Sequence, residues 1–413
     1  MKKKIIHLNH SDNKGGAARA CYRIHQSLLS SGTFDSEMWV NQVNSSDPTV
    51  TGPTSMFDKF LAKIRPHIVK PLIKMLKTQN PIIHSPQILP SNWVKKINDS
   101  DADIIHLHWV QGEMLSIADI GRIKKPLVWT LHDMWAFCGA EHLAWDDRWR
   151  DGYQHPNRPL HETGFDINLW SWRRKQRFWK KKIKIITPSR WLTKCVKDSF
   201  LMHNWPVSVI PNPIDTNLWK PTEKKIARDK LGLPINAPLI LFGALGGAQD
   251  FHKGFDLLLK AVHKLSDDHN MKNLELVVFG QDAPKSPPSV AFPIHYMGHL
   301  EDDFKLSMVY SAVDVMVVPS RQETFGQTAS EAQTCETPVV AFNIGGLADI
   351  VIHKKTGYLA KSFDTQDLAT GITWVLEHRK DNQLGKLGRK ESINRFSSEI
   401  VSTQYEKIYD QTL

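Results

Sequence analysis

The sequence predicts an α/β protein made of two doubly wound domains, each built around a parallel β-sheet. With 413 residues, the chain is longer than one hydrophobic core usually serves. Apolar runs of strand length alternate with helical patterns from end to end, which is typical of βαβ units. A segment rich in breakers, 211–222, divides this pattern into two series. We therefore expect a first domain over 1–211 and a second over 212–393, with a last helix at about 394–413 able to pack back on the first.

Each domain is expected to have its own series of strands. In the first series these are Lys4–Leu8, Asp103–Leu107, Leu127–Leu131, Ile183–Thr187 and Val207–Ile210. In the second series they are Leu239–Gly243, Leu274–Gly280, Ile294–Met297, Val315–Pro319 and Val339–Phe342. Ligands of such sheets bind beyond the carboxyl ends of the strands, so two facing sheets would frame one cleft.

The composition is that of an ordinary globular protein, with 41% hydrophobic and 23% charged residues. No apolar run is long enough for a transmembrane helix. The start, Met1–Leu8, reads as a first strand and not as a signal peptide. The four cysteines lack the spacing of a disulfide framework or a zinc site: Cys21, Cys138, Cys195 and Cys335. These features predict a cytoplasmic location.

Positive charge is concentrated in the first half of the chain. Residues 1–212 hold 31 of the 53 Lys and Arg residues but only 18 of the 43 Asp and Glu residues. Residues 57–77 have an apolar helical face opposite a lysine face, although Pro66 and Pro71 argue against one continuous helix. A second cluster, 173–182, mixes basic and aromatic side chains. Contact with an anionic membrane and ordinary solvated faces over core helices explain both segments equally well.

The most informative motif lies between two strands of the second series. Glu323 and Glu331 are eight residues apart and flank Phe325, Gly326 and Gln327. A helix that starts near Gly326 would direct its backbone N–H groups and its positive end toward a phosphate. The two glutamates could then accept hydrogen bonds from hydroxyls at opposite ends of one ligand. A solvated glutamate pair on an ordinary helix is the alternative, which the strand-glycine-helix setting disfavours.

This motif resembles the Glu-x7-Glu motif of the GT-B retaining glycosyltransferases of family 4. Residues 342–351 resemble the next strand and glycine loop of that family, and 209–215 resemble its interdomain hinge. The resemblance implies two facing Rossmann-like domains with an interdomain cleft. It also implies that Glu323 contacts donor-sugar hydroxyls and Glu331 the ribose. The backbone of Phe325, Gly326 and Gln327 would hold the phosphate and the sugar.

Two further positions are expected to face the donor diphosphate. Lys253 opens a predicted helix, where a cation could neutralise the leaving pyrophosphate. The family commonly adds an arginine directly after the preceding strand, and this chain has Ala244 there. In the first domain, Gly15 and Gly16 follow the first strand and allow phosphate to approach the backbone. A simple tight turn is the alternative for the glycine pair.

Several histidines are candidate site residues. His132 follows a predicted strand and resembles the family histidine that touches the donor sugar. His106 and His108 are expected to point to opposite faces of a strand, with core packing favoured over the cleft. A zinc site made by Cys138, His142 and His155 is disfavoured by its irregular spacing. We identify no Asp-x-Asp motif of the kind by which metal-dependent transferases hold a donor diphosphate, since the Asp-x-Asp spacings at 99–103 lead into a predicted strand and do not follow one. We therefore expect no metal and no other cofactor.

The sequence and this resemblance together predict a glycosyltransferase with His132, Lys253 and Glu323 as catalytic residues, and the resemblance alone implies that it is a retaining one. Its partners would be a nucleotide-diphosphate sugar, a glycan or polyprenyl-linked acceptor and an anionic membrane surface, but no nucleic acid, because no nucleic-acid module is present. A role in bacterial surface polysaccharide synthesis, including lipopolysaccharide, is a family-level expectation. The alternatives are a nucleotide-sugar 2-epimerase of the same fold, an inactive glycan-binding or scaffold protein, and a nicotinamide oxidoreductase.

Overall fold

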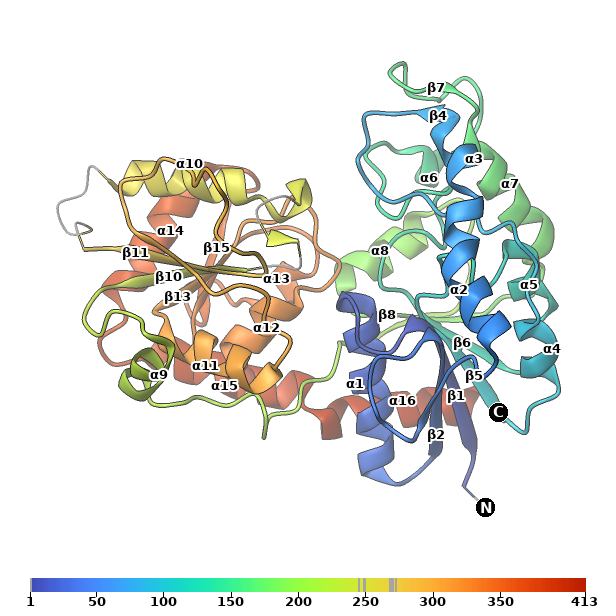
Figure 1. Ribbon diagram of the computed structural model, residues 1–413, viewed down its shortest axis with the longest axis horizontal. Helices are drawn as coiled ribbons and strands as arrows, with labels where there is room; N and C mark the ends of the chain where they lie inside the picture. The colour runs from blue at the N-terminus through green and yellow to red at the C-terminus, as the bar shows by residue number, and fades with distance from the viewer. Residues whose placement is uncertain (1, 244–245, 248–249, 267–270, 272) are drawn as a thin grey trace. The chain divides into compact units, whose positions relative to one another are not determined.

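The computed structural model describes the chain except residues 1, 244–245, 248–249, 267–270 and 272. The chain divides into two compact units (Figure 1), one formed by Met1–Pro211 with Val401–Leu413 and the other by Asn212–Ile400. The principal sheet of each unit is parallel throughout, which confirms the predicted α/β class. None of the described helices combines the length and the apolar character that crossing a bilayer requires.

The first unit has a seven-stranded sheet in the order β3-β2-β1-β5-β6-β8-β9. Its strands are β1 (Lys4–Ser11), β2 (Asp35–Gln42), β3 (Val50–Thr51), β5 (Ile104–Leu107), β6 (Leu127–Thr130), β8 (Lys184–Thr187) and β9 (Val207–Val209). A separate antiparallel pair joins β4 (Leu76–Lys77) to β7 (Thr163–Gly164). Strand β1 pairs with β5 and β5 with β6, so the carboxyl ends of these three strands lie together.

Helices cover both faces of this sheet because successive strand residues alternate in direction. One core contains Ile5, Ile104 and Val128 with residues of α1 (Gly16–Ser31) and the last helix, α16 (Ser398–Thr412). The other contains Ile6, Ile105 and Trp129. The remaining helices are α2 (Met56–Ile68), α3 (Lys70–Lys74), α4 (Trp93–Asn98), α5 (Ile117–Arg122), α6 (Arg148–Asp151), α7 (Ile167–Phe178) and α8 (Arg190–Asp198).

The second unit has a six-stranded sheet in the order β12-β11-β10-β13-β14-β15. Its strands are β10 (Leu239–Gly243), β11 (Glu275–Phe279), β12 (Ile294–Tyr296), β13 (Val315–Val318), β14 (Val339–Phe342) and β15 (Gly357–Ala360). Its helices are α9 (Lys224–Leu231), the 3-10 helix η2 (Phe251–Lys253), α10 (Phe255–Leu265), α11 (Asp303–Ala312), α12 (Gln327–Thr334), α13 (Leu347–Ile350), α14 (Thr365–Glu377) and α15 (Gln383–Phe396). Two apolar cores, one on each face, hold the helices to the sheet.

Ten predicted strands are present, each within a few residues of its expected bounds. The strands β2, β3, β4, β7 and β15 were not predicted. Helix α10 begins at Phe255, so the expected helix start at Lys253 was wrong. Lys253 instead ends η2, because Gly254 adopts a left-handed conformation with a φ of 68° that separates the two helices.

Candidate functional site

The segments that follow β10 and β13 meet at the carboxyl edge of the second sheet, because these strands are neighbours in it. The backbone N–H of Arg321 donates to the carbonyl oxygen of His252 at 2.7 Å. A Cβ on Gly254 would collide with the Pro319 carbonyl group. The two segments can therefore approach this closely only with glycine at position 254.

This close approach brings Lys253 and Glu323 into a direct ion pair. The Lys253 Nζ and Glu323 Oε2 atoms lie 2.8 Å apart, and the Ser320 hydroxyl donates to the same carboxylate oxygen at 3.2 Å. Burial would lower the pKa of Lys253, but the charge and hydrogen bond of Glu323, with Asp250, outweigh it and raise that pKa above 10.5. This edge of the sheet thus holds the Lys253 ammonium group, which can bind a phosphate, beside the Glu323 carboxylate, which can accept hydrogen bonds from hydroxyl groups.

The loop that carries Glu323 is held by glycines on both sides. Gly326 is the N-cap residue of α12 at a φ of 108°, and a Cβ there would lie 2.7 Å from Leu347 Cδ2. The Gly346 N–H donates to the Glu323 carbonyl oxygen at 2.9 Å. A Cβ on Gly346 would lie 2.5 Å from the Phe325 Cα. These contacts fix the backbone on which Glu323 and the start of α12 depend.

Phe325 and Gln327 differ in what they can offer a ligand. The Phe325 side chain is buried and packs edge-on against Phe396, with ring centroids 5.6 Å apart. Only its backbone can therefore serve a phosphate. Gln327 is the first residue of α12, whose first turn carries no acidic side chain. The positive end of that helix is thus not neutralised by a carboxylate of its own first turn.

Glu331 lies deeper than Glu323. It is buried on α12, and its Oε2 accepts a hydrogen bond from the Tyr310 hydroxyl at 2.9 Å. Tyr310 belongs to α11 and was not predicted as a site residue. Its role depends on how α11 packs against α12, and nothing in the local sequence marks that contact.

A separate cavity in the second unit lies away from these residues. It is lined by Asn236, Asn273, Glu275 and Pro293, near the amino ends of β10 and β11. Ligands of parallel sheets bind at the opposite, carboxyl ends. We therefore assign this cavity no part in the site.

In the first unit, Gly15 and Gly16 form the start of α1. Gly15 is the N-cap residue with a φ of 98°, and a Cβ there would meet no atom within 4 Å. The buried Asp12 carboxylate accepts backbone hydrogen bonds from Asn44 at 2.9 Å and Ser45 at 2.7 Å. Burial would raise the pKa of Asp12, but these hydrogen bonds lower it below 3.8. Asp12, which the sequence did not single out, thus positions the loop before the glycine pair.

His132 follows β6 and is partly buried. Its Nε2 lies 3.1 Å from the Nδ1 of His108, and the two rings are stacked. Burial lowers the pKa of His132 to about 4, although the neighbouring Asp133 opposes the shift. Asp133 is held by Trp109 Nε1 at 3.0 Å and by His142 Nδ1 at 2.6 Å. His132 is therefore a neutral imidazole at pH 7, fixed at the carboxyl edge of the first sheet.

The predicted site residues thus fall into two groups. Lys253, Glu323, Phe325, Gly326, Gln327 and Glu331 gather in the second unit, and Gly15, Gly16 and His132 belong to the first. Each group lies at the carboxyl edge of its own parallel sheet. Ala244 lies outside the described residues.

Comparison with known proteins identifies the family. Residues 14–218 match the family described as Glycosyltransferase Family 4, and residues 223–391 match the one described as Glycosyl transferases group 1. The chain belongs to glycosyltransferase family 4. Both predictions of the sequence, the family and its GT-B fold, are confirmed.

Relatives of this family 4 chain include D-inositol 3-phosphate glycosyltransferase 2 of Catenulispora acidiphila, which is 31% identical over 223 residues. The alignment covers 50% of this chain and 51% of that protein, so the chain matches about half the length of this relative. Anabaena HepE, solved in complex with UDP-glucose, superposes with a TM-score of 0.64 at 17% identity over 99% of both chains. WaaG, a glycosyltransferase involved in lipopolysaccharide biosynthesis, gives 0.61 at 15% identity, also over 99% of both chains. At sequence identities this low, the likeness of these two structures to this chain shows a shared fold and nothing more.

Two expectations about histidines in this family 4 chain were tested by the geometry. His106 and His108 do not point to opposite faces: their ring centroids are 4.1 Å apart and both are buried. That prediction was wrong because residues two apart along a strand share a face. The disfavoured zinc trio does not assemble either. His142 bonds to Asp133 and Ser85, and the described residues yield no metal-like cluster containing it.

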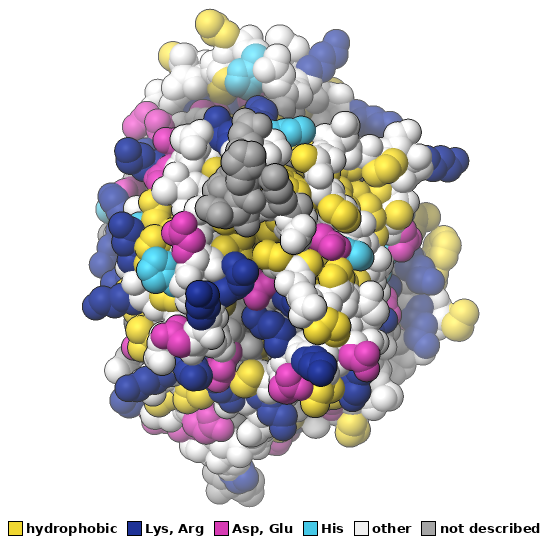
Figure 2. All heavy atoms as spheres, turned by 90° about the vertical axis from the view of Figure 1, so that its left-hand side faces the viewer, with side chains coloured by type: hydrophobic (Ala, Val, Ile, Leu, Met, Phe, Trp, Pro, Cys, Tyr) yellow, Lys and Arg dark blue, Asp and Glu magenta, His cyan; other side chains and the backbone are white. Residues whose placement is uncertain are grey.

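The basic segments of this family 4 chain are not uniformly exposed. Lys175, inside the second cluster, is buried and donates to the carbonyl oxygens of Trp135, Cys138 at 3.1 Å and Gly139 at 2.7 Å. Arg174 donates to two backbone carbonyl oxygens. These two side chains are therefore structural. The face shown in Figure 2, which is the left-hand side of Figure 1, carries Lys and Arg side chains mixed with Asp and Glu side chains.

Proposed function

We propose that the chain is a retaining glycosyltransferase that moves a sugar from a nucleotide-diphosphate donor to a glycan or lipid-linked acceptor. The observation that carries this proposal is the Lys253–Glu323 pair at the carboxyl edge of the second sheet, beside the start of α12. Lys253 and the α12 backbone bind the diphosphate, Glu323 accepts from sugar hydroxyls, and Glu331 accepts from the ribose. UDP-glucose, bound by a protein of the same fold, is the first donor to try.

The proposed reaction requires that water, which would hydrolyse the donor, is kept from the reacting centre. The bond between the sugar C1 and the diphosphate oxygen breaks, and C1 bonds to an acceptor hydroxyl oxygen. The hydroxyl proton passes to the departing phosphate oxygen. Lys253 stabilises the charge that develops on this leaving group. Retention of configuration is part of this proposal, and so is a reaction that uses no metal or other cofactor.

Charge-removing variants test the donor edge. Lys253→Met and Glu323→Gln should each lower the rate of transfer by 100-fold or more, about 3 kcal/mol of transition-state stabilisation. Asp256→Asn is the matched control, because it removes a charge from the exposed Arg321–Asp256 pair in the same region. Full activity in both site variants would contradict the assignment of this edge as the donor site. Conversion of the donor sugar to its epimer without an acceptor would instead identify an epimerase.

We further propose that the acceptor is lipid-linked and that the protein works on the cytoplasmic face of a membrane, in polysaccharide synthesis. Helix α2 supports this role: Met56, Phe57 and Phe60 are exposed at 80%, 67% and 58%. Two exposed lysines accompany these side chains: Lys59 lies between Phe57 and Phe60 in the sequence, and Lys63 follows Phe60. Exposed aromatic side chains interspersed with lysines suit an anionic bilayer surface.

The rest of the chain anchors this helix firmly. The Arg65 guanidinium donates to the carbonyl oxygens of Glu113 at 2.8 Å and Leu89 at 2.6 Å. Val69, which is buried, separates α2 from α3, so the proline-interrupted segment forms two helices. A membrane-bound α2 would therefore hold the whole first unit at the surface.

Vesicle sedimentation tests the membrane proposal. Vesicles with anionic lipid should bind the chain, and neutral vesicles should not. Phe57→Ser with Phe60→Ser should weaken binding about tenfold or more, since each loses exposed apolar area that would enter the bilayer. Leu160→Ser, at a fully exposed apolar residue outside this helix, is the control. Equal binding to both vesicle types would contradict the proposal.

A further inference from the structure

A buried lysine supports the loop that follows the carboxyl end of β6. Lys175, on α7, is fully buried, and its Nζ donates to three backbone carbonyl oxygens: those of Trp135, Cys138 at 3.1 Å and Gly139 at 2.7 Å. The same Nζ lies 3.8 Å from the centroid of the Trp135 ring, within the range of a cation–π interaction. An ammonium group has three N–H donors and no acceptor, so three converging carbonyl oxygens match its charged form.

The neutral form of Lys175 does not match this arrangement. A neutral amine keeps two N–H donors and gains a lone pair, so one of the three carbonyl oxygens loses its hydrogen bond. The cation–π interaction with the Trp135 ring is lost as well. The contacts that hold the loop 135–139 against α7 at this point therefore depend on the charge of one buried nitrogen atom.

This nitrogen atom loses its charge near neutral pH. Burial lowers the pKa of Lys175 from 10.5 to about 7, and the guanidinium group of Arg174 also lowers it. The carboxylates of Glu141 and Asp133 oppose the shift. The Cys138 thiol faces Lys175 too, but burial raises the pKa of this thiol well above 9.0, so the thiol stays uncharged. Charged and neutral Lys175 are therefore both present at pH 7, and the neutral form prevails at pH 9.

One residue of the loop connects Lys175 to the carboxyl edge of the first sheet. The carbonyl oxygen of Trp135 accepts from Lys175, and the N–H of Trp135 donates to Asp133 Oδ1 at 2.9 Å. Asp133 directly follows the predicted site residue His132 in the chain. A change in the position of the Trp135 backbone therefore reaches Asp133 through a single hydrogen bond.

We propose that Lys175 is a positioning residue, whose ammonium group holds the loop 135–139 in the conformation that places Asp133, and that loss of its proton releases part of this loop. Sugar transfer should then be slower when Lys175 is neutral. This consequence for transfer rests on the proposed function, whereas the state of the loop does not.

The stability of the first unit should change in the opposite direction. Between pH 7 and 10.5, the unfolded chain holds a proton on Lys175 that the folded chain has lost. Lys175 therefore makes the folded chain more stable as the pH rises through this range. A lysine that served packing alone would give a protein that is more stable and no less active at pH 9 than at pH 7. A protein that is more stable but transfers sugar more slowly indicates a positioning role.

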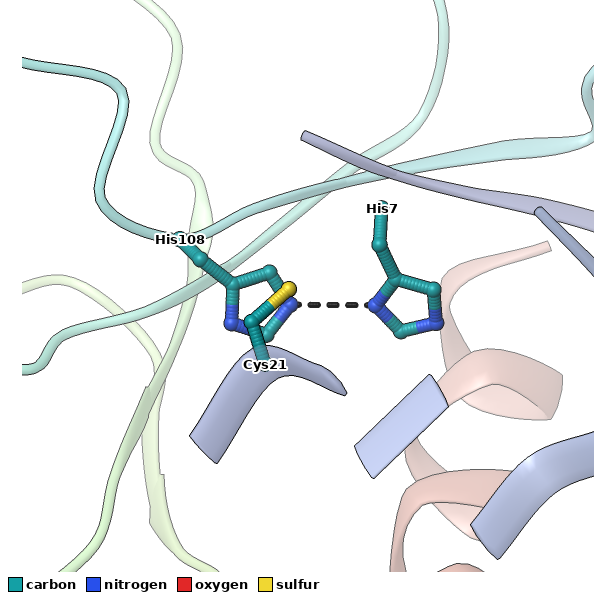
Figure 3. Close-up of side chains that lie close together, drawn as sticks. All are labelled: His7, Cys21 and His108. Atoms are coloured by element: carbon teal, nitrogen blue, oxygen red, sulfur yellow. Dashed lines mark hydrogen bonds between the residues drawn. The ribbon is translucent and has the colours of Figure 1, made fainter. Parts of the chain in front are cut away.

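The buried histidines of the first unit lose their protons in a different range. Figure 3 shows His7, Cys21 and His108 close together, with 3.0 Å between His7 Nδ1 and His108 Nε2. Burial lowers the pKa of both histidines well below 6.5 and raises that of the Cys21 thiol well above 9.0. These three groups stay uncharged between pH 7 and 9, so a transition in that range does not come from them.

Nuclear magnetic resonance can measure the charge of Lys175 and the state of the loop without any sugar. In protein labelled with carbon-13 lysine, the Cε signal of Lys175 should shift with a midpoint at about pH 7, whereas an ordinary lysine titrates at about pH 10.4. This signal is identified by its absence in Lys175→Met and, independently, by a higher midpoint in Arg174→Gln. The backbone amide signals of the loop 135–139 should change with the same midpoint. A Lys175 that stays charged at pH 9, or loop signals that do not follow its titration, would overturn the proposal.

Kinetics test the consequence for transfer. The wild-type kcat/KM should fall about fivefold from pH 7 to pH 9, because one hydrogen bond is worth about tenfold and about half of the molecules are already neutral at pH 7. In Arg174→Gln the fall should occur at higher pH. Arg173→Met, which removes an exposed charge from the same helix, is the matched control and should keep the wild-type profile.

The outcomes separate this proposal from the proposed function. A kcat/KM that does not fall up to pH 9, in a protein whose Lys175 titrates at about pH 7, would reduce Lys175 to a packing residue. Titration of Lys175 and of the loop signals in a protein that transfers no sugar would instead refute the proposed function and support the release of the loop.

Discussion

The first unit should lose stability steeply in weak acid, because its core holds uncharged histidines. Burial lowers the pKa of His25 and His132 to about 4, and those of His7, His106 and His108 lie well below 6.5. Between these values and 6.5, the unfolded chain binds protons that the folded chain does not. Stability therefore falls as the pH falls through this range.

The magnitude follows from the same shifts. From pH 7 to pH 5, a histidine with a folded pKa of about 4 costs about 2 kcal/mol, so His25 and His132 together cost about 4 kcal/mol. The lowered pKa values of His7, His106 and His108 act in the same direction. This loss is a large part of the whole stability of a typical domain, about 5–15 kcal/mol, so the first unit should be markedly less stable at about pH 5 than at pH 7.

Urea unfolding followed by tryptophan fluorescence measures this effect in the right unit. Of the 14 tryptophans, only Trp219 and Trp374 lie outside the first unit. His25 bonds to Ser36 and Thr49, and His25→Gln should remove about 2 kcal/mol of the pH dependence by deleting one titrating group. Unfolding free energies that agree within 1 kcal/mol at the two pH values, about 7 and 5, would refute this reasoning.

Three substitutions probe the two edges. Gly346→Ala should destabilise the second unit by about 1–3 kcal/mol, because the added Cβ would lie 2.5 Å from the Phe325 Cα. It should also weaken donor binding. Thermal unfolding measures the first effect and donor titration the second. Tyr310→Phe should cost about 1 kcal/mol by removing the hydrogen bond to Glu331, with a matching loss in donor affinity by calorimetry. Asp12→Asn should cost about 2 kcal/mol in urea unfolding, since an amide replaces a buried carboxylate that accepts several N–H groups; an unchanged midpoint would contradict that role.

The strands were predictable wherever apolar residues run continuously. Strands buried on both faces of a parallel sheet read as such runs, and β10 and β14 have the predicted bounds. Strand β2 was missed because its residues, Asp35–Gln42, include charged and amide side chains that interrupt the apolar run. Strand β15 was missed because it starts with glycine, which is depleted in strands, so only its last three residues form an apolar run.

The site was predictable only in the parts that a linear motif contains. Glu323, Gly326 and Glu331 lie within one loop and helix, so their spacing carried the prediction. Asp12 and Tyr310 act through packing contacts with segments distant in the sequence, which no local pattern marks. The burial of Lys175 inside a basic cluster has the same cause, since its carbonyl partners come from a separate loop.

The most direct test of the central claim is donor binding at the Lys253–Glu323 edge. Thermal unfolding is measured with UDP-, GDP-, ADP- and dTDP-sugars, without acceptor or added metal. One donor should stabilise the chain saturably, by about 2.7 kcal/mol at 100 times its Kd. That stabilisation should vanish in Lys253→Met and Glu323→Gln and persist in Asp256→Asn. No stabilisation by any donor, or equal stabilisation of all four proteins, would contradict the assignment of this edge as the donor site.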